Sequence, residues 1–329
     1  MSALQELLRK FKGKRIVVLG DFVADVFVYG EISRVSREAP VLVLNQRETQ
    51  VVPGGGANAV HNLRALGAEP LPIGILGDDA EGNQLIKYFK KLGIDTGGIR
   101  VAKSYRTPTK MRILAGAVHS QRQQIVRLDS GGPTSKTNER KFLEHRLKSL
   151  LPRADALLVS DYGFGIILPD LVSGVAGNGI PATVDSRFAM TAFSGMTAAT
   201  PNEPEVEAAL GITIGNDMDK LEWAGRTLMR RLKHNALLIT RGKDGMALFE
   251  RSAKTTHIPI HGTDEIADVT GAGDTVISVF TLALAAGGSF ADAARLANYA
   301  GGIVVMKHGT RPVAYNELRD VIGGVNEFG

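Results

Sequence analysis

Hydrophobic positions along the chain form short continuous runs that alternate with segments of helical periodicity. Six runs are almost entirely apolar, which is typical of strands covered on both faces. They predict strands at Arg15–Leu19, Pro72–Leu76, Ala156–Ser160, Ala182–Asp185, Ala236–Thr240 and Met246–Glu250. The intervening segments predict helices at Asn58–Leu66, Glu81–Lys91, Lys141–Leu150, Glu203–Leu210, Leu221–Lys233 and Phe290–Met306. This alternation predicts an α/β fold with a parallel sheet sandwiched between helices.

Two stretches, Val26–Val52 and Thr107–Leu128, alternate apolar and polar residues instead. Such alternation indicates antiparallel strands with one face in water. Each stretch is inserted between elements of the parallel sheet, so we expect a small β-sheet lid over the carboxyl edge of that sheet. A lid there would exclude water from a bound ligand. Ordinary edge strands would give the same pattern. No repeat, low-complexity tract or linker divides the sequence, which predicts one domain over residues 1–329.

Composition narrows the class of protein. The 329 residues are 44% hydrophobic and 22% charged, which excludes wholesale disorder. The net charge is +5, but the basic residues are dispersed, so we expect no nucleic-acid partner. The chain has no cysteine, which excludes thiolate chemistry and fits a cytoplasmic enzyme. Its longest apolar stretch, Val276–Ala286, is too short to cross a bilayer, so we expect no membrane association.

The motif Thr270-Gly-Ala-Gly-Asp-Thr275 precedes that apolar stretch. Gly271 and Gly273 allow close backbone approach to a ligand, and the N-terminus of the following helix favours an anion. An acid in a loop that merely held phosphate would repel its ligand. Asp274 is therefore a candidate general base for a hydroxyl that attacks a γ-phosphoryl group. The amides of Ala272 and Gly273 would then hold the developing charge. An N-cap aspartate after a glycine turn is the structural alternative.

The segment Asp268–Thr275 resembles the C-terminal signature of the ribokinase-like, or PfkB-type, carbohydrate kinases. Four further motifs resemble that family in the same order along the chain: Gly20-Asp-Phe-Val-Ala-Asp25, Pro53-Gly-Gly-Gly-Ala-Asn58, Thr200-Pro-Asn-Glu-Pro-Glu205 and Thr240-Arg-Gly-Lys-Asp-Gly245. The resemblance covers essentially the whole chain. It implies a ribokinase-like three-layer α/β/α sandwich with a small antiparallel lid, and ATP-dependent transfer of a phosphoryl group to a sugar hydroxyl.

The resemblance also implies roles for individual residues. The substrate-binding residues would be Asp25, Gly54, Gly55, Asn58, Lys110, Arg112, Asp161 and Arg187. ATP would contact Asn202, Thr240, Arg241, Gly242, Gly245 and Asn298, and Mg²⁺ would be positioned by Asn202 and Glu205. A monovalent cation such as K⁺ would lie beside the loop Glu265–Thr270. The alternatives are a turn capped by Asn58, an ordinary first-turn acid at Glu205 and a solvated Arg241.

One branch of the family, the bacterial heptose 7-phosphate kinases, is similar in further segments: Gly30–Val41, Gln123–Asp129, Ser160-Asp-Tyr-Gly163 and Lys307-His-Gly-Thr310. This implies phosphorylation of the anomeric hydroxyl of D-glycero-D-manno-heptose 7-phosphate, a step toward lipopolysaccharide. In several bacteria this kinase is fused to a nucleotidyltransferase, and we expect the kinase part alone here. A substrate phosphate needs a basic clamp, for which Arg34, Lys110, Arg112 and Arg187 are candidates.

The chain departs from the branch at three places and leaves alternatives open. Phe164 replaces a lysine, Val26 an arginine, and Ser186-Arg187 a Pro-Lys pair. The substrate could be another sugar or sugar phosphate, or the chain a catalytically silent sugar-binding regulator. The retained glycines and acid of the Thr270–Thr275 motif favour the enzyme. Neither a dinucleotide-binding glycine motif after Gly20 nor a P-loop motif is present. An apolar lid face would favour a homodimer formed through the lid.

Overall fold

A nine-stranded sheet forms the centre of the molecule in the computed structural model, which describes residues 2–116, 123–133, 139–173, 175, 179–262, 268–307 and 309–325. The strand order is β13-β12-β11-β10-β9-β8-β1-β4-β5. The bounds are β1 Arg15–Gly20, β4 Glu69–Gly77, β5 Ile99–Ala102, β8 Ala156–Asp161, β9 Ala182–Ser186, β10 Ala198–Ala199, β11 Ala236–Thr240, β12 Met246–Glu250 and β13 Thr256–Ile258. Pairing is parallel from β5 to β11 and antiparallel at β12 and β13, so the predicted mainly parallel sheet is confirmed.

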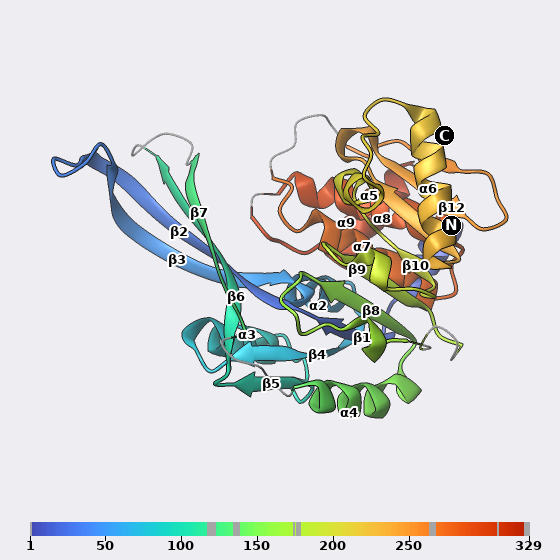
Figure 1. Cartoon of the computed structure of the whole chain (residues 1–329), viewed down its shortest axis with the longest axis horizontal. Helices are drawn as coiled ribbons and strands as arrows, with labels where there is room; N and C mark the ends of the chain where they lie inside the picture. The colour runs from blue at the N-terminus through green and yellow to red at the C-terminus, as the bar shows by residue number, and fades with distance from the viewer. Residues whose placement is uncertain are drawn as a thin grey trace.

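Helices cover both faces of this sheet (Figure 1). Alternate residues of β1 point to opposite sides: Ile16 and Val18 enter one hydrophobic core, Val17 and Leu19 the other. The first core is closed by α1 Ala3–Arg9, α2 Gly56–Ala65, α3 Ala80–Lys91, α7 Ala272–Ala285, α8 Phe290–Val305 and α9 Tyr315–Val325. The second is closed by α4 Arg140–Leu150, α5 Glu203–Leu210 and α6 Met218–Leu232. The predicted three-layer sandwich is confirmed.

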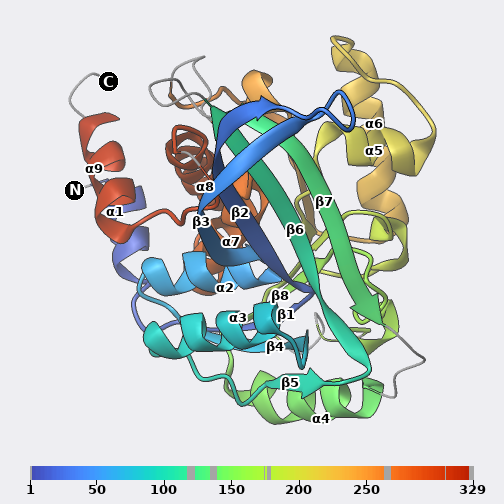
Figure 2. The same ribbon diagram turned by 90° about the vertical axis from the view of Figure 1, so that its left-hand side faces the viewer.

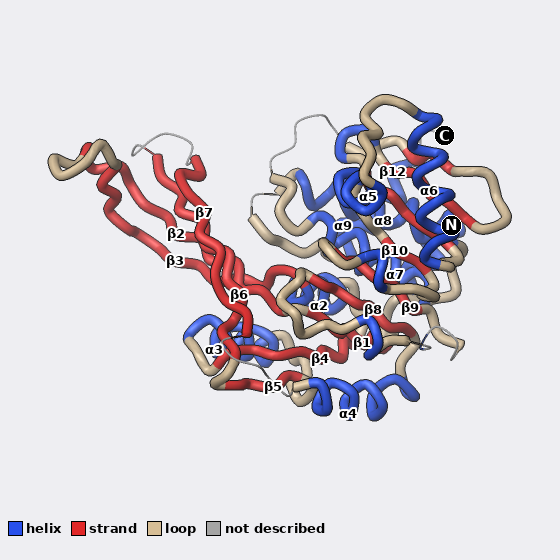
Figure 3. Tube along the Cα trace, in the orientation of Figure 1, coloured by secondary structure: helices blue, strands red, loops and turns tan. Residues whose placement is uncertain are grey.

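A second sheet projects from the core as the expected lid (Figures 1 and 3). It contains β2 Phe22–Val35, β3 Leu42–Gly55, β6 Tyr105–Gly116 and β7 Gln123–Pro133 in the order β3-β2-β6-β7. The outer pairs are antiparallel, as predicted, but the central pair β2–β6 is parallel. The two strands run in the same direction because each leaves the core at the same edge. Residues 117–122 of the second predicted insertion lie outside the described part of the chain.

The lid is continuous with the core at its base, as Figure 2 shows. One residue, Asp21, separates the end of β1 from the start of β2, and β3 ends at Gly55, directly before α2 begins at Gly56. The first lid insertion therefore extends beyond the predicted range of Val26–Val52 at both ends. In the described residues, no helix combines the length and the apolar character needed to cross a membrane.

Candidate active site

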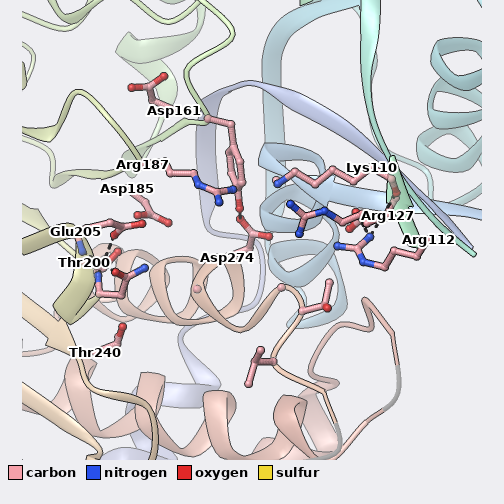
Figure 4. A pocket seen from close by; sticks show the side chains of 18 residues that line it. Lys110, Arg112, Arg127, Asp161, Asp185, Arg187, Thr200, Glu205, Thr240 and Asp274 are labelled. Atoms are coloured by element: carbon pink, nitrogen blue, oxygen red, sulfur yellow. Dashed lines mark hydrogen bonds and ion pairs between the residues drawn. The ribbon is translucent and has the colours of Figure 1, made fainter. Parts of the chain in front are cut away.

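A cavity of about 420 Å³ lies between the lid and the carboxyl ends of the parallel strands (Figure 4). Residues from the lid, from strand ends and from the loop before α7 line it together: Asp25, Gly55, Lys110, Arg112, Arg127, Asp161, Tyr162, Asp185, Arg187, Thr200, Asn202, Glu205, Thr240, Val269, Thr270, Gly271, Gly273 and Asp274. Open α/β sheets bind their ligands at this edge. The cavity is the candidate substrate site.

Asp274 lies in the first turn of α7 and is only 3% exposed. Both of its carboxylate oxygens accept hydrogen bonds. Tyr162 donates its hydroxyl to Oδ1 at 2.8 Å, and Asn58 donates Nδ2 to Oδ2 at 3.1 Å. Burial raises the pKa of Asp274 to about 7, while the hydrogen bonds from Asn58 and Tyr162 lower it. A fixed carboxyl with a pKa near neutrality suits a general base.

Gly271 precedes α7 with φ +79°, a left-handed conformation in which glycine is favoured. A Cβ at this position would lie 2.6 Å from Asn58 Nδ2, which donates to the Gly271 carbonyl at 3.3 Å. The Ala272 amide donates to the Val269 carbonyl at 3.2 Å. Among the described residues the Gly273 and Asp274 amides have no hydrogen-bond partner. Of the two amides predicted to hold developing charge, that of Gly273 is available.

Asp25 lies in β2 and is buried. Its Oδ1 forms an ion pair with Arg112 Nη1 at 2.7 Å, and its Oδ2 accepts the Thr310 hydroxyl at 2.9 Å. Gly54 passes so close that a Cβ there would be 2.4 Å from Asp25 Oδ2. The Arg112 guanidinium also packs over the Phe27 ring, 5.3 Å from its centroid. Arg112 is therefore already paired with Asp25, and this ion pair forms one wall of the cavity.

The opposite wall carries acids that repel one another. Asp185 at the end of β9 has a pKa raised well above its usual value, first by burial and then by Glu205 and Asp274. Burial also raises the pKa of Glu205. Glu205 and Asn202 form a capping box: each side chain accepts the amide of the other, at 2.9 and 2.8 Å. Asp161 accepts the Ser186 hydroxyl at 2.6 Å.

The acids beside the cavity are candidate ligands for a magnesium ion. Among the described residues no cluster of three or more His, Cys, Asp or Glu side chains is arranged to hold a metal by protein ligands alone. Asp185 and Glu205 nevertheless offer two repelling carboxyl groups beside the cavity, and a divalent cation would relieve that repulsion. Mg²⁺ in phosphotransfer sites is held by one or two carboxylates together with phosphates and water. The residues present fit that mode.

The cations of the cavity differ in their partners. Lys110 Nζ lies over the Tyr162 ring, 4.6 Å from its centroid, and the Arg187 guanidinium packs beside Phe188. Neither Lys110 nor Arg187 forms an ion pair with a described residue. They are close enough that Arg187, after burial, lowers the pKa of Lys110. Arg34 is exposed in β2 and is not among the lining residues, so it does not join the predicted clamp.

A second cavity of about 540 Å³ adjoins the first and is more apolar. It is lined by several of the predicted ATP-binding residues, namely Asn202, Thr240, Arg241, Gly242, Gly245 and Asn298. Both cavities share Asn202, Thr240, Val269 and Gly273. Asn298 donates Nδ2 to the Pro259 carbonyl at 2.9 Å. Arg241 Nε forms an ion pair with Glu203 at 2.7 Å, so it is not the free loop cation that the sequence allowed.

Several residues in or beside the site had no role assigned from the sequence, among them Arg127, Tyr162, Asp185 and Asp21. Arg127 in β7 lines the cavity and pairs with Asp129 at 2.9 Å. Tyr162 contacts Asp274, and Asp21 accepts the Tyr162 amide at 2.9 Å. The Ser-Asp-Tyr-Gly segment was noted in the sequence, but its tyrosine had no assigned role. For the expected monovalent-cation site, residues 265–267 lie outside the described part of the chain.

Two bacterial proteins are similar to the chain over most of its length, and both are named "Bifunctional protein HldE". The one from Geobacter sulfurreducens is 40% identical over 314 residues, which cover 93% of this chain and 62% of the relative. The one from Coxiella burnetii strain Dugway is 39% identical over 312 residues, which cover 94% of this chain and 64% of the relative. The chain thus spans less than two thirds of the length of either relative.

Solved structures share the fold at low sequence identity. A structure of Arabidopsis thaliana ribokinase complexed with ribose and ATP has a TM-score of 0.73 at 19% identity, covering 94% of this chain and 99% of that one. Phosphofructokinase-2 from Escherichia coli in complex with substrates and products has a TM-score of 0.76 at 20% identity, covering 95% and 99%. Both matches support the ribokinase-like fold.

The family model described as pfkB family carbohydrate kinase matches residues 14–169 and 181–316, which include the lid, both cavities and the start of α7 with Asp274. The chain belongs to the pfkB family of carbohydrate kinases.

Proposed function

We propose that the chain transfers the γ-phosphoryl group of ATP to the anomeric hydroxyl of D-glycero-D-manno-heptose 7-phosphate. One observation carries the proposal: a single cavity holds a fixed carboxyl base and two cations, Lys110 and Arg187, that form no ion pair with a described residue. A neutral sugar needs no such cations, whereas a sugar phosphate does. The resemblance to the heptose 7-phosphate kinases selects the sugar, and the chain would act as one kinase domain in the cytoplasm.

In this proposal the sugar lies in the 420 Å³ cavity and ATP in the adjoining cavity of 540 Å³. The shared residue Gly273 marks the meeting point of the two ligands. Asp274 takes the proton from the sugar hydroxyl as that oxygen attacks the γ-phosphorus, and the bond from this phosphorus to the β-phosphate oxygen breaks so that ADP leaves. The Gly273 amide donates to the charge that develops. Bound Mg²⁺, held through Asp185 and Glu205, would neutralise the phosphate oxygens. The lid keeps water away from the transferring group.

The substrate assignment is tested by measuring ATP consumption with heptose 7-phosphate and with the unphosphorylated heptose. We expect turnover with the first, and a KM for it that rises at least about tenfold in Lys110→Met and in Arg187→Met, with the KM for ATP nearly unchanged. Arg34→Met is the matched control, because it removes an exposed lid cation outside the cavity. Turnover of a neutral sugar but not of the sugar phosphate would refute the assignment and favour another sugar as substrate.

We also propose a homodimer formed through the lid. Seven large apolar side chains of the lid and its turn are between 40% and 60% exposed: Ile32, Val35, Val41, Leu42, Ile125, Val126 and Leu128. Such a concentration on one projecting element is typical of an interface. Light scattering after gel filtration should give twice the mass of 35.1 kDa, and Val35→Lys combined with Leu128→Lys should give the monomer mass. A monomeric wild-type chain would refute this proposal.

A further inference from the structure

The loop after β8 lies between the candidate base and the lid. Tyr162, the first residue after β8, points its hydroxyl at Asp274 Oδ1, 2.8 Å away. The Nζ of Lys110, from lid strand β6, lies over the ring of the same side chain, 4.6 Å from its centroid. One side chain thus contacts both the base and a lid cation.

A buried carboxyl group accepts hydrogen bonds from the backbone of this loop. Asp21, between β1 and β2, is 2% exposed, and its Oδ2 accepts the amide of Tyr162 at 2.9 Å and that of Phe164 at 3.3 Å. Gly55 adds a close contact, since a Cβ there would be 3.1 Å from Tyr162 Cε2. Asp21 does not line either of the two cavities described above, so it cannot act on a ligand there directly.

We propose that Tyr162 is a positioning residue that fixes the carboxyl group of Asp274 for proton abstraction, and that Asp21 in turn holds Tyr162 in place. The inference rests on the proposed function. Its physical basis is that a carboxylate held at both oxygens keeps one orientation, whereas loss of one donor frees it to rotate. Asn58 supplies the other hydrogen bond, from the opposite side of the carboxyl group.

Loss of the Tyr162 hydroxyl should change the pKa of Asp274 as well as the orientation of its carboxyl group. The hydrogen bond from Tyr162 stabilises the ionised form of Asp274 and so lowers its pKa, against the larger effect of burial. Removing the hydroxyl should therefore move the acid limb of the kcat profile to higher pH. A residue that only filled space would leave this limb where it was. The pH profile thus separates positioning of the base from simple packing.

The experiment compares Tyr162→Phe with wild type, using ATP and the sugar phosphate from about pH 5.5 to about pH 9, a range that brackets the pKa of Asp274. We expect the plateau kcat to fall about tenfold, with the KM for ATP within about twofold and the acid limb at higher pH. Tyr105→Phe is the matched control, because it removes a buried hydroxyl that has no hydrogen-bond partner among the described residues. It should leave kcat and the acid limb unchanged.

Asp21 is tested by two substitutions. Asp21→Asn keeps an oxygen that can accept both amides and should retain at least about half of kcat, with the acid limb still present. Asp21→Ala removes the acceptor and should reproduce the profile of Tyr162→Phe. An unchanged plateau in Tyr162→Phe, or an unmoved acid limb, would overturn the inference even where the protein is less stable. A wild-type chain without sugar-dependent ATP turnover would instead refute the proposed function.

Discussion

Replacement of Gly271 by alanine should both destabilise the fold and disturb the position of Asp274, the proposed base. The backbone there has φ +79°, and an L-residue in this region costs about 1–2 kcal/mol. The added Cβ would lie 2.6 Å from Asn58 Nδ2, so the amide must withdraw. It then loses a neutral hydrogen bond to the Gly271 carbonyl and a charge-assisted one to Asp274, worth about 0.5–1.5 and 1.5–3 kcal/mol. Together these give about 3–6.5 kcal/mol.

The matched control is Gly287→Ala. Gly287 has φ +86°, yet a Cβ there would meet nothing within 4 Å. This substitution carries the backbone strain alone, about 1–2 kcal/mol. Urea denaturation of both variants at one pH measures the two losses, and the difference between them reports on Asn58. Equal destabilisation by the two alanines would refute the reasoning, because it would mean that Asn58 yields at no cost.

Three further predictions concern the charged groups. Asp274→Asn should lower kcat by about 10²–10⁴-fold while calorimetry still detects ATP binding, since an amide cannot accept the proton; unchanged turnover would remove this residue from the mechanism. The contribution of Asp21 and Asp274 to the free energy of unfolding should decrease as pH rises from about 4 to about 7, because both carboxyls stay protonated in the folded chain after unfolded carboxyls have ionised, whereas burial of His61, which lowers its pKa to about 4, acts in the opposite direction; a wild-type urea midpoint that falls no more steeply over this range than that of Asp274→Asn would contradict this. Arg112→Ala should destabilise the chain by about 3–5 kcal/mol, because it leaves Asp25 buried without its cation, whereas Arg127→Ala should change stability by less than about 1 kcal/mol in the same urea titrations.

The sheet was predictable from the sequence because burial on both faces leaves a continuous apolar run. Ala236–Thr240 and Met246–Glu250 were placed at their observed bounds for this reason. Short strands carry no such signal. Ala198–Ala199 is a strand of two residues, and Thr256–Ile258 pairs at the edge of the sheet. Their pairing follows from the neighbouring strands rather than from their own side chains.

The candidate site was predictable as a set of motifs but not as a set of contacts. The glycines and Asp274 are recognisable because a tight turn before a helix demands those residue types. The partner of each charge depends on segments far apart in the sequence: Thr310 bonds to Asp25 across 285 positions. Arg112 and Arg241 carry the charge expected of ligand contacts, yet each has an acidic partner within the protein. The sequence shows which residues are charged, but the partner of each charged side chain depends on the fold.

The direct passage from β3 into α2 limits how this chain can vary in length. Because the strand ends at Gly55 and the helix begins at Gly56, a residue inserted at this junction would displace Asn58 from Asp274. The far turn between β2 and β3, residues 36–41, is mostly exposed and connects to no element of the core. We expect insertions and deletions among natural homologues to collect at that distal turn. The distal turn would then vary in length between homologues, whereas the junction between β3 and α2 would keep its length.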